Sequence, residues 1–122
     1  KLMKRAVDFK NSIYKICTEN DWKSAQINGL FKGAGIDLKD GFIHFSSSKQ
    51  VKETAKLHFS GVRKLLLLKI DPSGLNIEWE PSRNNTLFPH LYDDLPLENV
   101  KSVFKLRLDK NNNHIFPPEL ND

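Results

Sequence analysis

The sequence has little of what builds disulfide frameworks or metal clusters. Cys17 is the single cysteine among 122 residues, so an internal disulfide is excluded. The four histidines show none of the close His-x-x-x-His or His-Glu spacings typical of zinc sites, so we expect no metal. Cys17 lies in a strand-like stretch with no motif around it, and we therefore expect a buried, inert thiol. A reducing, cytoplasmic setting is the default for such a chain.

Long apolar runs are also missing. The longest begins at Leu65 and ends near Ile70. This is far short of the ~20 residues that cross a bilayer, so we expect no membrane partner. The first residues, KLMKRAVDFKNS, are basic without a long apolar region, and we expect no secretory signal. We interpret residues 1–12 as a loosely ordered N-terminal extension and residues 13–122 as a single domain.

The positive charge is modest and spread along the chain. The net charge is +4, and the basic residues are scattered from Lys1 to Lys110 without a dense run. Nucleic-acid-binding proteins usually show a clustered basic stripe or a known motif, so nucleic acid is a possible but not a favoured partner. A small-molecule ligand the size of a nucleotide remains compatible with this charge.

Hydrophobic patterning predicts an α+β fold with a mixed, mainly antiparallel sheet of about five to six strands and two short helices. The DPSG turn at residues 71–74 suggests that the strands on either side of it pair as a hairpin. Prolines argue against regular structure in residues 87–100. The predicted strands are residues 12–18, 41–46, 64–71, 75–80 and 100–109, with a short edge strand at 114–116.

The two helices are predicted from their capping signals. The first is expected to begin at Asn20 or Asp21, with Trp22 as its main anchor, and to end at Gly29. The second is expected to be capped by Ser47 or Ser48, since Ser47 and Gln50 have the spacing of a capping box. The glycine-rich stretch between the helices, KGAGIDLKDG, lacks the Lys-Ser/Thr ending of a phosphate loop and is interpreted as a structural connector.

Two stretches contain the best candidates for a binding site. In GFIHFSS, His44 shares a strand face with Ser46, directly before the predicted helix N-terminus, where free backbone N–H groups favour an anion. In FPHLY, Phe88, His90 and Tyr92 crowd a proline-held loop. A partly buried core histidine is an equally good interpretation of His44.

Carboxylates near the later strands leave a hydrolase open, although solvated surface acids are the simpler interpretation. These residues are Glu78, Glu80, Asp93, Asp94 and Glu98.

Several motifs taken together resemble a known bacterial family, the domain of unknown function 952. The resemblance covers roughly residues 13–108, and its name implies no activity. The motifs that carry it are IYKI, Trp22, NGLF, DGFIHFSSSKQV, Thr54–Ala55, Phe59, LLLLKID, the WE pair at 79–80 and FPHLYDDLPLENV.

This family in turn looks like a distant relative of the ADP-ribosyltransferase fold. GFIHFSSSKQVKETA is similar to the Gly-Ile-Tyr-Phe strand-then-helix segment of poly-ADP-ribose polymerase-type enzymes, with His44 in place of the tyrosine that stacks on nicotinamide. The run from Trp22 through NGL to IHFS resembles RNA 2′-phosphotransferases, which use NAD to take up a phosphate. The resemblance implies an ADP-ribosyltransferase-like sheet and NAD or ADP-ribose as a possible cofactor.

The resemblance also implies residue roles. The first core strand of such enzymes supplies a His or Arg that holds the NAD ribose, whereas this chain offers Tyr14, Lys15 or Cys17. His44 would orient the substrate, and Glu98, in PLENV, is the positional candidate for the acid that stabilises positive charge on the ribose.

Three hypotheses follow. The first is a domain that binds a nucleotide-like, phosphorylated or ribosylated small molecule around His44 and His90. The second is a transferase or phosphotransferase that uses NAD or ADP-ribose, with His44 and Glu98 as catalytic residues. The third is a non-catalytic protein-interaction module that uses the aromatic loop 88–92. The ligand-binding residues expected under the first are Tyr14, Trp22, His44, Ser46, Ser47, His90 and Tyr92.

Overall fold

A four-stranded antiparallel sheet forms the centre of the molecule. The computed structural model describes residues 11–121, so the expected extension at residues 1–12 lies almost wholly outside the described part. Strand β5 has a partner on both sides, as expected for the continuous apolar run LLLL. In sheet order the strands are β4 (Ser46–Ser47), β1 (Ile13–Thr18), β5 (Leu65–Ile70) and β9 (Val100–Leu106).

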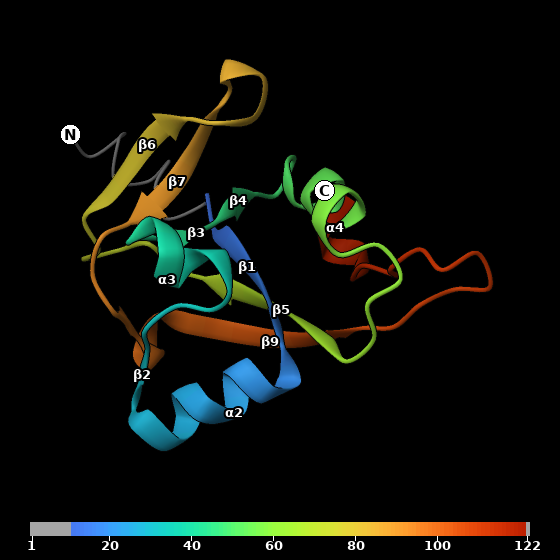
Figure 1. The fold of residues 1–122 in the computed structure, drawn as a ribbon, viewed down its shortest axis with the longest axis horizontal. Helices are drawn as coiled ribbons and strands as arrows, with labels where there is room; N and C mark the ends of the chain where they lie inside the picture. Colours follow the sequence, from blue (N-terminus) through green and yellow to red (C-terminus); the bar gives the residue numbers. More distant parts are fainter. Residues whose placement is uncertain (1–10, 122) are drawn as a thin grey trace.

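Two smaller antiparallel sheets lie beside this one. Strand β7 (Leu87–Leu91) is the middle strand of the first, between β3 (Ile43–His44) and β6 (Ile77–Pro81). Strands β6 and β7 form a hairpin that projects from the body of the molecule, with a short turn of 3-10 helix, η1 (Arg83–Asn85), at its tip (Figure 1). The second pairs β2 (Leu30–Phe31) with β8 (Leu95–Pro96).

One stretch of chain, residues 43–47, is shared between the main sheet and the hairpin sheet. Its first part, β3, pairs with β7, and its second part, β4, pairs with β1 at Ile13 and Tyr14. The break falls at Phe45, whose N–H donates to the Pro89 carbonyl at 3.0 Å. Within residues 11–121, no strand pairs with the edge of β1 from Lys15 to Thr18 on this side. The main sheet is therefore open beside the second half of β1.

The fold is α+β as expected, but the strand pairing differs from the prediction. All strand pairs in the described residues are antiparallel, and five strands have five or more residues. The expected hairpin between residues 64–71 and 75–80 is wrong, because β6 pairs with β7 and β5 pairs with β1 and β9. The expected edge strand at 114–116 is reduced to a single bridge between Leu108 and His114.

The prediction of irregular structure in residues 87–100 is also wrong, and Pro89 shows why. The N–H and C=O of one strand residue point to the same side of the strand. Because the Pro89 carbonyl accepts from Phe45, the N–H that proline lacks would also face the break between β3 and β4. No ladder bond to β6 is lost, so β7 tolerates the proline in a central position.

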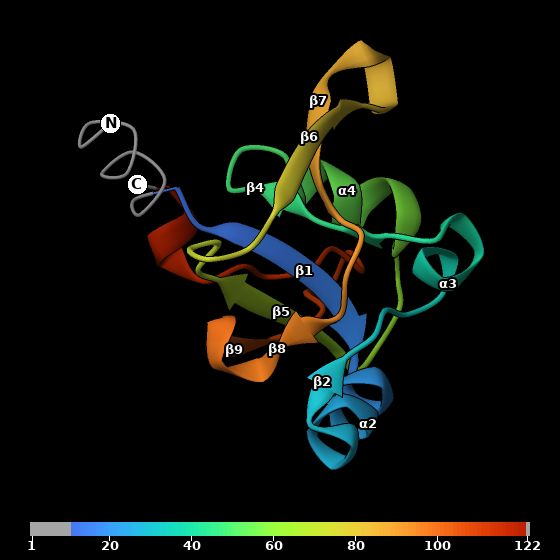
Figure 2. The same ribbon diagram turned by 90° about the vertical axis from the view of Figure 1, so that its left-hand side faces the viewer.

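Within the described residues, three α-helices surround the main sheet, one more than expected: α2 (Glu19–Asn28), α3 (Ile36–Asp40) and α4 (Val51–His58) (Figure 2). Helix α2 ends at Gly29, which has φ of +81°, as predicted. It begins earlier than predicted, because Thr18 and Asp21 form a reciprocal capping box.

The expected serine cap of the later helix is wrong. Residues 48–50 form a turn, and α4 begins only at Val51, with Gln50 as its N-cap residue. The Gln50 side chain instead accepts from the Ser47 N–H at 2.9 Å and donates to the Leu87 carbonyl at 2.8 Å. The anion-binding helix start that was expected next to His44 is therefore displaced along the chain.

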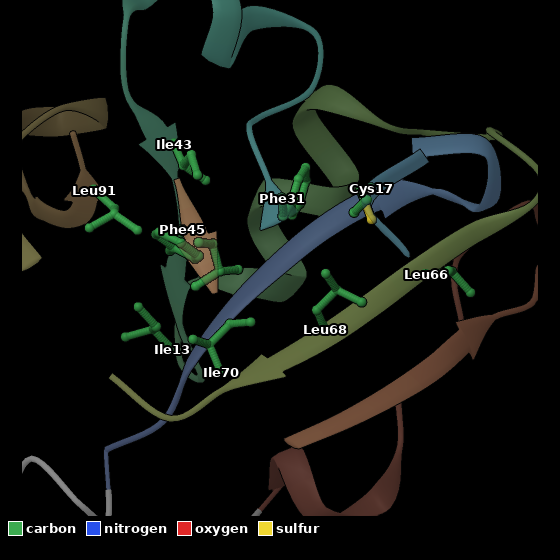
Figure 3. Close-up of a cluster of buried hydrophobic side chains, with 11 residues drawn as sticks. Ile13, Cys17, Phe31, Ile43, Phe45, Leu66, Leu68, Ile70 and Leu91 are labelled. Carbon is green, nitrogen blue, oxygen red and sulfur yellow. The ribbon is translucent and has the colours of Figure 1, made fainter. Parts of the chain in front are cut away.

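Alternate residues of β1 and β5 pack into two apolar clusters, one on each face of the main sheet. Leu66, Leu68 and Ile70 face the first cluster, which also contains Phe31, Phe45 and Leu91 (Figure 3). Leu65 and Leu67 face the second, which is covered by α4 and by Leu120 near the end of the chain, in the 3-10 segment η3 (Pro118–Asn121).

Replacing Leu68 should test the first cluster. Leu68 is completely buried in β5, so Leu68→Ala should lower the free energy of unfolding by about 2–5 kcal/mol through lost burial and a residual cavity. Leu57→Ala on the exposed side of α4 is the matched control and should change it by about 0.5 kcal/mol or less. Urea denaturation measures both, and equal losses would contradict the assignment of the core.

Candidate functional site

A cavity of about 590 Å³ lies at the opening in the main sheet. This volume is within the range of small-molecule sites in proteins, roughly 300–1,000 Å³. Its walls come from β1, from the region of α3, from the shared stretch 43–47, from α4 and from the β6–β7 hairpin. Aromatic and aliphatic side chains form much of the wall. Among the lining residues are Tyr14, Lys15, Ile16, Cys17, Asp40, His44, Phe45, Ser46, Thr54, His58, Phe59, Arg83, Phe88 and His90.

A buried ion pair, Lys15–Asp37, joins the two sides of the opening. The Lys15 ammonium lies 2.7 Å from Asp37 Oδ2, and the two side chains are 8% and 1% exposed. Lys15 also donates to the His44 carbonyl at 3.0 Å, so one side chain connects the free edge of β1 to β3. Asp37 in turn accepts from the Ala34 and His44 backbone N–H groups at 3.0 and 3.1 Å.

The loop before Asp37 passes close to the Asp37 side chain, and Gly33 makes this close approach possible. A Cβ at Gly33 would lie 3.0 Å from Asp37 Cβ, and Gly33 has φ of +117°, a conformation that other residues rarely adopt. Burial alone raises the pKa of Asp37. The hydrogen bond from His44 and the charge of Lys15 outweigh that effect and hold the pKa below its usual 3.8. Asp37 is therefore an anion in the folded protein at neutral pH.

His44 lies between two carboxylates of α3. Its Nδ1 is 2.7 Å from Asp37 Oδ1, and its Nε2 is 3.0 Å from Asp40 Oδ2. The contact with Asp37 is a hydrogen bond, and the contact with Asp40 is an ion-pair contact between α3 and β3. The side chain is 28% exposed, so it is neither sealed in the core nor bonded to backbone through its ring. His44 thus fastens α3 to β3 at the wall of the cavity.

His90 forms a second carboxylate–histidine pair. Its Nδ1 donates to Glu80 Oε1 at 2.7 Å across the β6–β7 ladder, and the Tyr92 hydroxyl donates to the same oxygen at 2.7 Å. These hydrogen bonds, the one from His90 first, hold the pKa of Glu80 below its usual value. With the proton on Nδ1, a neutral His90 presents Nε2 as an acceptor. Nε2 is buried and has no hydrogen-bond partner among the described residues.

Phe42 connects the two histidines. Its ring centroid lies 4.5 Å from that of His44 and 4.2 Å from that of His90. The Tyr92 ring is 5.0 Å away, and the two imidazoles are themselves 5.3 Å apart, close to perpendicular. Rings at these separations pack favourably in tilted or edge-on arrangements. The aromatic group therefore fixes both imidazoles at one side of the cavity.

The Cys17 side chain lines the cavity, but its thiol is not an activated nucleophile. Burial raises its pKa to about 12, so it is protonated at neutral pH. The expectation of a buried, inert thiol is consistent with this position.

The structure brings together four of the residues predicted to form the site: Tyr14, His44, Ser46 and His90 all line the cavity. Ser46 is buried, and its hydroxyl lies 3.0 Å from Thr54 Oγ1.

The other four predicted residues do not line the cavity. Trp22 packs against the first apolar cluster. The Ser47 N–H is bonded to Gln50. Tyr92 is more than half exposed on the far side of Glu80. Glu98 is exposed in a short 3-10 segment, η2 (Leu97–Asn99).

Sequence reasoning did not assign several charged residues to the site, among them Asp37, Asp40 and Arg83. The KGAGIDLKDG stretch was interpreted as a connector, although it contains α3 and both aspartates. A signal was present, since Asp37 and Asp40 lie between closely spaced glycines, a pattern that allows an acidic turn to approach the body of a protein. The sequence carried no comparable signal for Arg83.

The buried ion pair generates a stability prediction. Asp37→Asn leaves the Lys15 ammonium buried without a counter-ion and should lower the free energy of unfolding at pH 7 by about 3–5 kcal/mol. Adding Lys15→Met to this variant should restore part of the loss. Asp94→Asn, at an exposed position, is the matched control and should have almost no effect. Urea denaturation of the four proteins checks this, and a double variant less stable than Asp37→Asn would contradict it.

The same pair predicts an acid dependence. The pKa of Asp37 is lower in the folded chain than in the unfolded chain, so the unfolded state takes up the proton first as the pH falls. The stability that the Asp37 carboxylate contributes is fully present above its pKa in the unfolded chain. It is lost as the pH falls through its pKa in the folded chain. The difference in unfolding free energy between wild type and Asp37→Asn should therefore shrink between about pH 5 and pH 3. A constant difference over that range would show that Asp37 does not titrate as argued.

Comparison with known proteins identifies a family and similar solved structures. The family described as "Protein of unknown function (DUF952)" matches residues 16–103. The X-ray crystal structure of protein CC0527 from Caulobacter crescentus is similar, with 38% identity, a TM-score of 0.84 and coverage of 90% of this chain and 98% of that chain. The solution NMR structure of the same protein gives 39% identity and a TM-score of 0.75, covering 84% and 90%. No curated protein matches significantly. The chain belongs to the DUF952 family of proteins of unknown function.

Proposed function

We propose that this chain binds a small nucleotide-like molecule, phosphorylated or ribosylated, in the cavity beside β1. The observation that carries the proposal is His90, which lines the cavity and whose buried Nε2 has no hydrogen-bond partner within residues 11–121. A buried, unsatisfied ring nitrogen costs free energy in the empty protein. A ligand donor that reaches Nε2 from the cavity, after a small movement of the wall that now covers this atom, would recover it.

The composition of the wall fits such a ligand. Phe45, Phe59 and Phe88 offer apolar surface to a planar ring. Arg83 brings positive charge, whereas the charge of Lys15 is balanced by Asp37, and the Ser46 and Thr54 hydroxyls add polar groups to the same wall. Pockets that combine an apolar wall with a few convergent polar groups are the usual form of small-molecule sites.

We further propose that the fold is related to that of the ADP-ribosyltransferases. Support comes from the sequence resemblance around GFIHFSS and from the two sheets that separate at Phe45, with the cavity at their junction. NAD or ADP-ribose is accordingly the first ligand class to test.

The geometry gives less support to the two alternatives. In the transferase hypothesis Glu98 stabilises charge on the ribose, but that side chain is exposed and does not line the cavity. In the interaction-module hypothesis the loop 88–92 meets a protein partner, yet residues 88–91 are buried in β7, and Tyr92 alone of the five is exposed.

A thermal-shift screen tests ligand binding. NAD, ADP-ribose, AMP and ribose 5-phosphate should be added to the full chain, and at least one should raise the melting temperature. A ligand at 100 times its dissociation constant stabilises by about 2.7 kcal/mol. If none of the four raises the melting temperature of a folded sample, the proposal is wrong.

Variants at His90 locate the site. His90→Phe removes Nε2 while keeping an aromatic ring of similar size, so it should abolish most of the shift. Tyr92→Phe is the matched control, because it deletes a hydrogen bond to the same Glu80 oxygen outside the cavity, and it should keep the shift. An undiminished shift in folded His90→Phe would place the ligand elsewhere.

A further inference from the structure

Arg83 projects from the tip of the β6–β7 hairpin into the wall of the cavity. The side chain is 19% exposed, although η1, which contains it, is an otherwise solvent-exposed turn. Its Cζ lies 4.8 Å from the centroid of the Phe88 ring. A guanidinium at this distance from an aromatic face is held by a cation–π contact, which fixes the orientation of the plane. Arg83 is thus a positioned side chain that reaches from the hairpin toward α4.

Most of the hydrogen-bonding capacity of Arg83 is unused. Nη2 contacts Thr54 Oγ1 and Glu53 Oε1, each at 3.3 Å. Among the described residues, Nη1 and Nε have no partner. A guanidinium carries five N–H donors in a planar fork, which suits two oxygens of one phosphate or carboxylate. The free donors therefore form a preset site for an oxyanion.

The charge of Arg83 is also the least compensated in the cavity. Lys15 is the other lining cation of the arginine–lysine type, and buried Asp37 neutralises it at 2.7 Å. The counter-ion of Arg83 is Glu53, which is 61% exposed and 3.3 Å away. Such an exposed pair contributes little and separates readily.

The acids that line the cavity within the described part of the chain, Asp21 and Asp40, are already engaged. Asp21 accepts from the Thr18 N–H at 3.2 Å, and Asp40 lies 3.0 Å from His44 Nε2. Neither contacts Arg83, so an incoming anion meets the more weakly compensated of the cations Lys15 and Arg83 at the hairpin.

We propose that Arg83 binds the phosphate group of the ligand, while the uncharged part of the ligand extends toward His90. This inference rests on the proposed function and makes it more specific. The ligand is then a phosphate ester that enters between the hairpin and α4 and displaces Glu53 from the guanidinium. The Thr54 hydroxyl accepts from Nη2 at 3.3 Å and donates to the Gln50 carbonyl at 3.2 Å, so it helps to hold the guanidinium in place.

Calorimetric titration of the full chain with AMP and with adenosine tests this assignment. Wild type should bind AMP at least 10-fold more tightly than adenosine, because hydrogen bonds to charged groups are the stronger kind. Arg83→Gln should reduce AMP affinity about 10- to 100-fold and leave adenosine affinity within about 2-fold. Arg83→Lys should lose a large part of the preference for AMP over adenosine, since lysine keeps the charge but lacks the planar set of N–H donors.

The Glu53→Gln variant provides a readout that a structural role of Arg83 would not give. Removing the competing carboxylate should raise AMP affinity about 2- to 5-fold, with no change for adenosine. Equal binding of AMP and adenosine by wild type, or unaltered AMP binding by Arg83→Gln, would overturn the Arg83 assignment while leaving a binding site around His90 intact. A failure of both ligands to bind counts against the proposed function itself.

A second measurement is independent of the nucleoside. The Nε–H signal of Arg83 in NMR spectra, assigned with Arg83→Lys, should shift and saturate as inorganic phosphate is added at constant ionic strength. The exposed side chains of Arg63 and Arg107 are internal controls and should shift weakly without saturation. An Arg83 signal that behaves like these two shows that no oxyanion site exists at the hairpin, and the inference is then wrong.

Discussion

The buried pair between Lys15 and Asp37 is the interaction on which the site depends. A sheet that opens beside a strand edge leaves backbone and apolar surface without cover. Here one ammonium, anchored by one carboxylate, connects the free edge of β1 to β3 and to α3 at the same time. Such a pair costs desolvation and adds little net stability compared with apolar packing. Its value lies in the geometry that it fixes.

Carboxylates and one aromatic ring also orient the two histidines of the site. His44 is held by Asp37 and Asp40 on one side, and Glu80 holds His90 on the other, with Phe42 packed between them. Each imidazole is thus oriented by a carboxylate and restrained by an aromatic ring. The difference lies in the remaining nitrogen. In His44 both nitrogens are occupied, whereas Nε2 of His90 is left without a partner. The sequence pointed to His44 as the main candidate for a ligand contact. In the structure, the ring nitrogen that is left for a ligand belongs to His90.

Local patterns predicted much of the fold. The α+β class, the central strand at residues 65–70 and the glycine end of α2 followed from apolar runs and capping rules. Pairing did not follow, because the DPSG turn favoured a local hairpin, while β5 is instead covered on both sides by β1 and β9. Pro89 was misjudged for a related reason: its cost depends on which neighbour its missing N–H would face, and that is a tertiary fact.

The site was less predictable than the fold. His44, Ser46 and His90 could be found from the sequence, because histidines and hydroxyls within apolar strand-like stretches are candidates for a binding site. Asp37 and Arg83 do not stand out, since an acid in a glycine-rich loop and an arginine in a polar turn normally face water. Their burial arises from a long-range encounter between α3, β1 and the hairpin. The resemblance to the transferases pointed to Glu98 through its position in the chain, and position alone does not bring a side chain to a cavity.

Helix α3 has a consequence for how such a site can diversify. Asp37 is its one buried residue, while Ile36 and Leu38 are exposed, and glycines with positive φ stand at both of its ends. Substitutions at the outer positions cost the core nothing, yet Ile36 lines the cavity. A substitution at Ile36 can therefore alter the wall of the cavity while Asp37 still holds the helix in place. The cavity surface can thus vary in this short helix separately from the constraints that preserve the sheet.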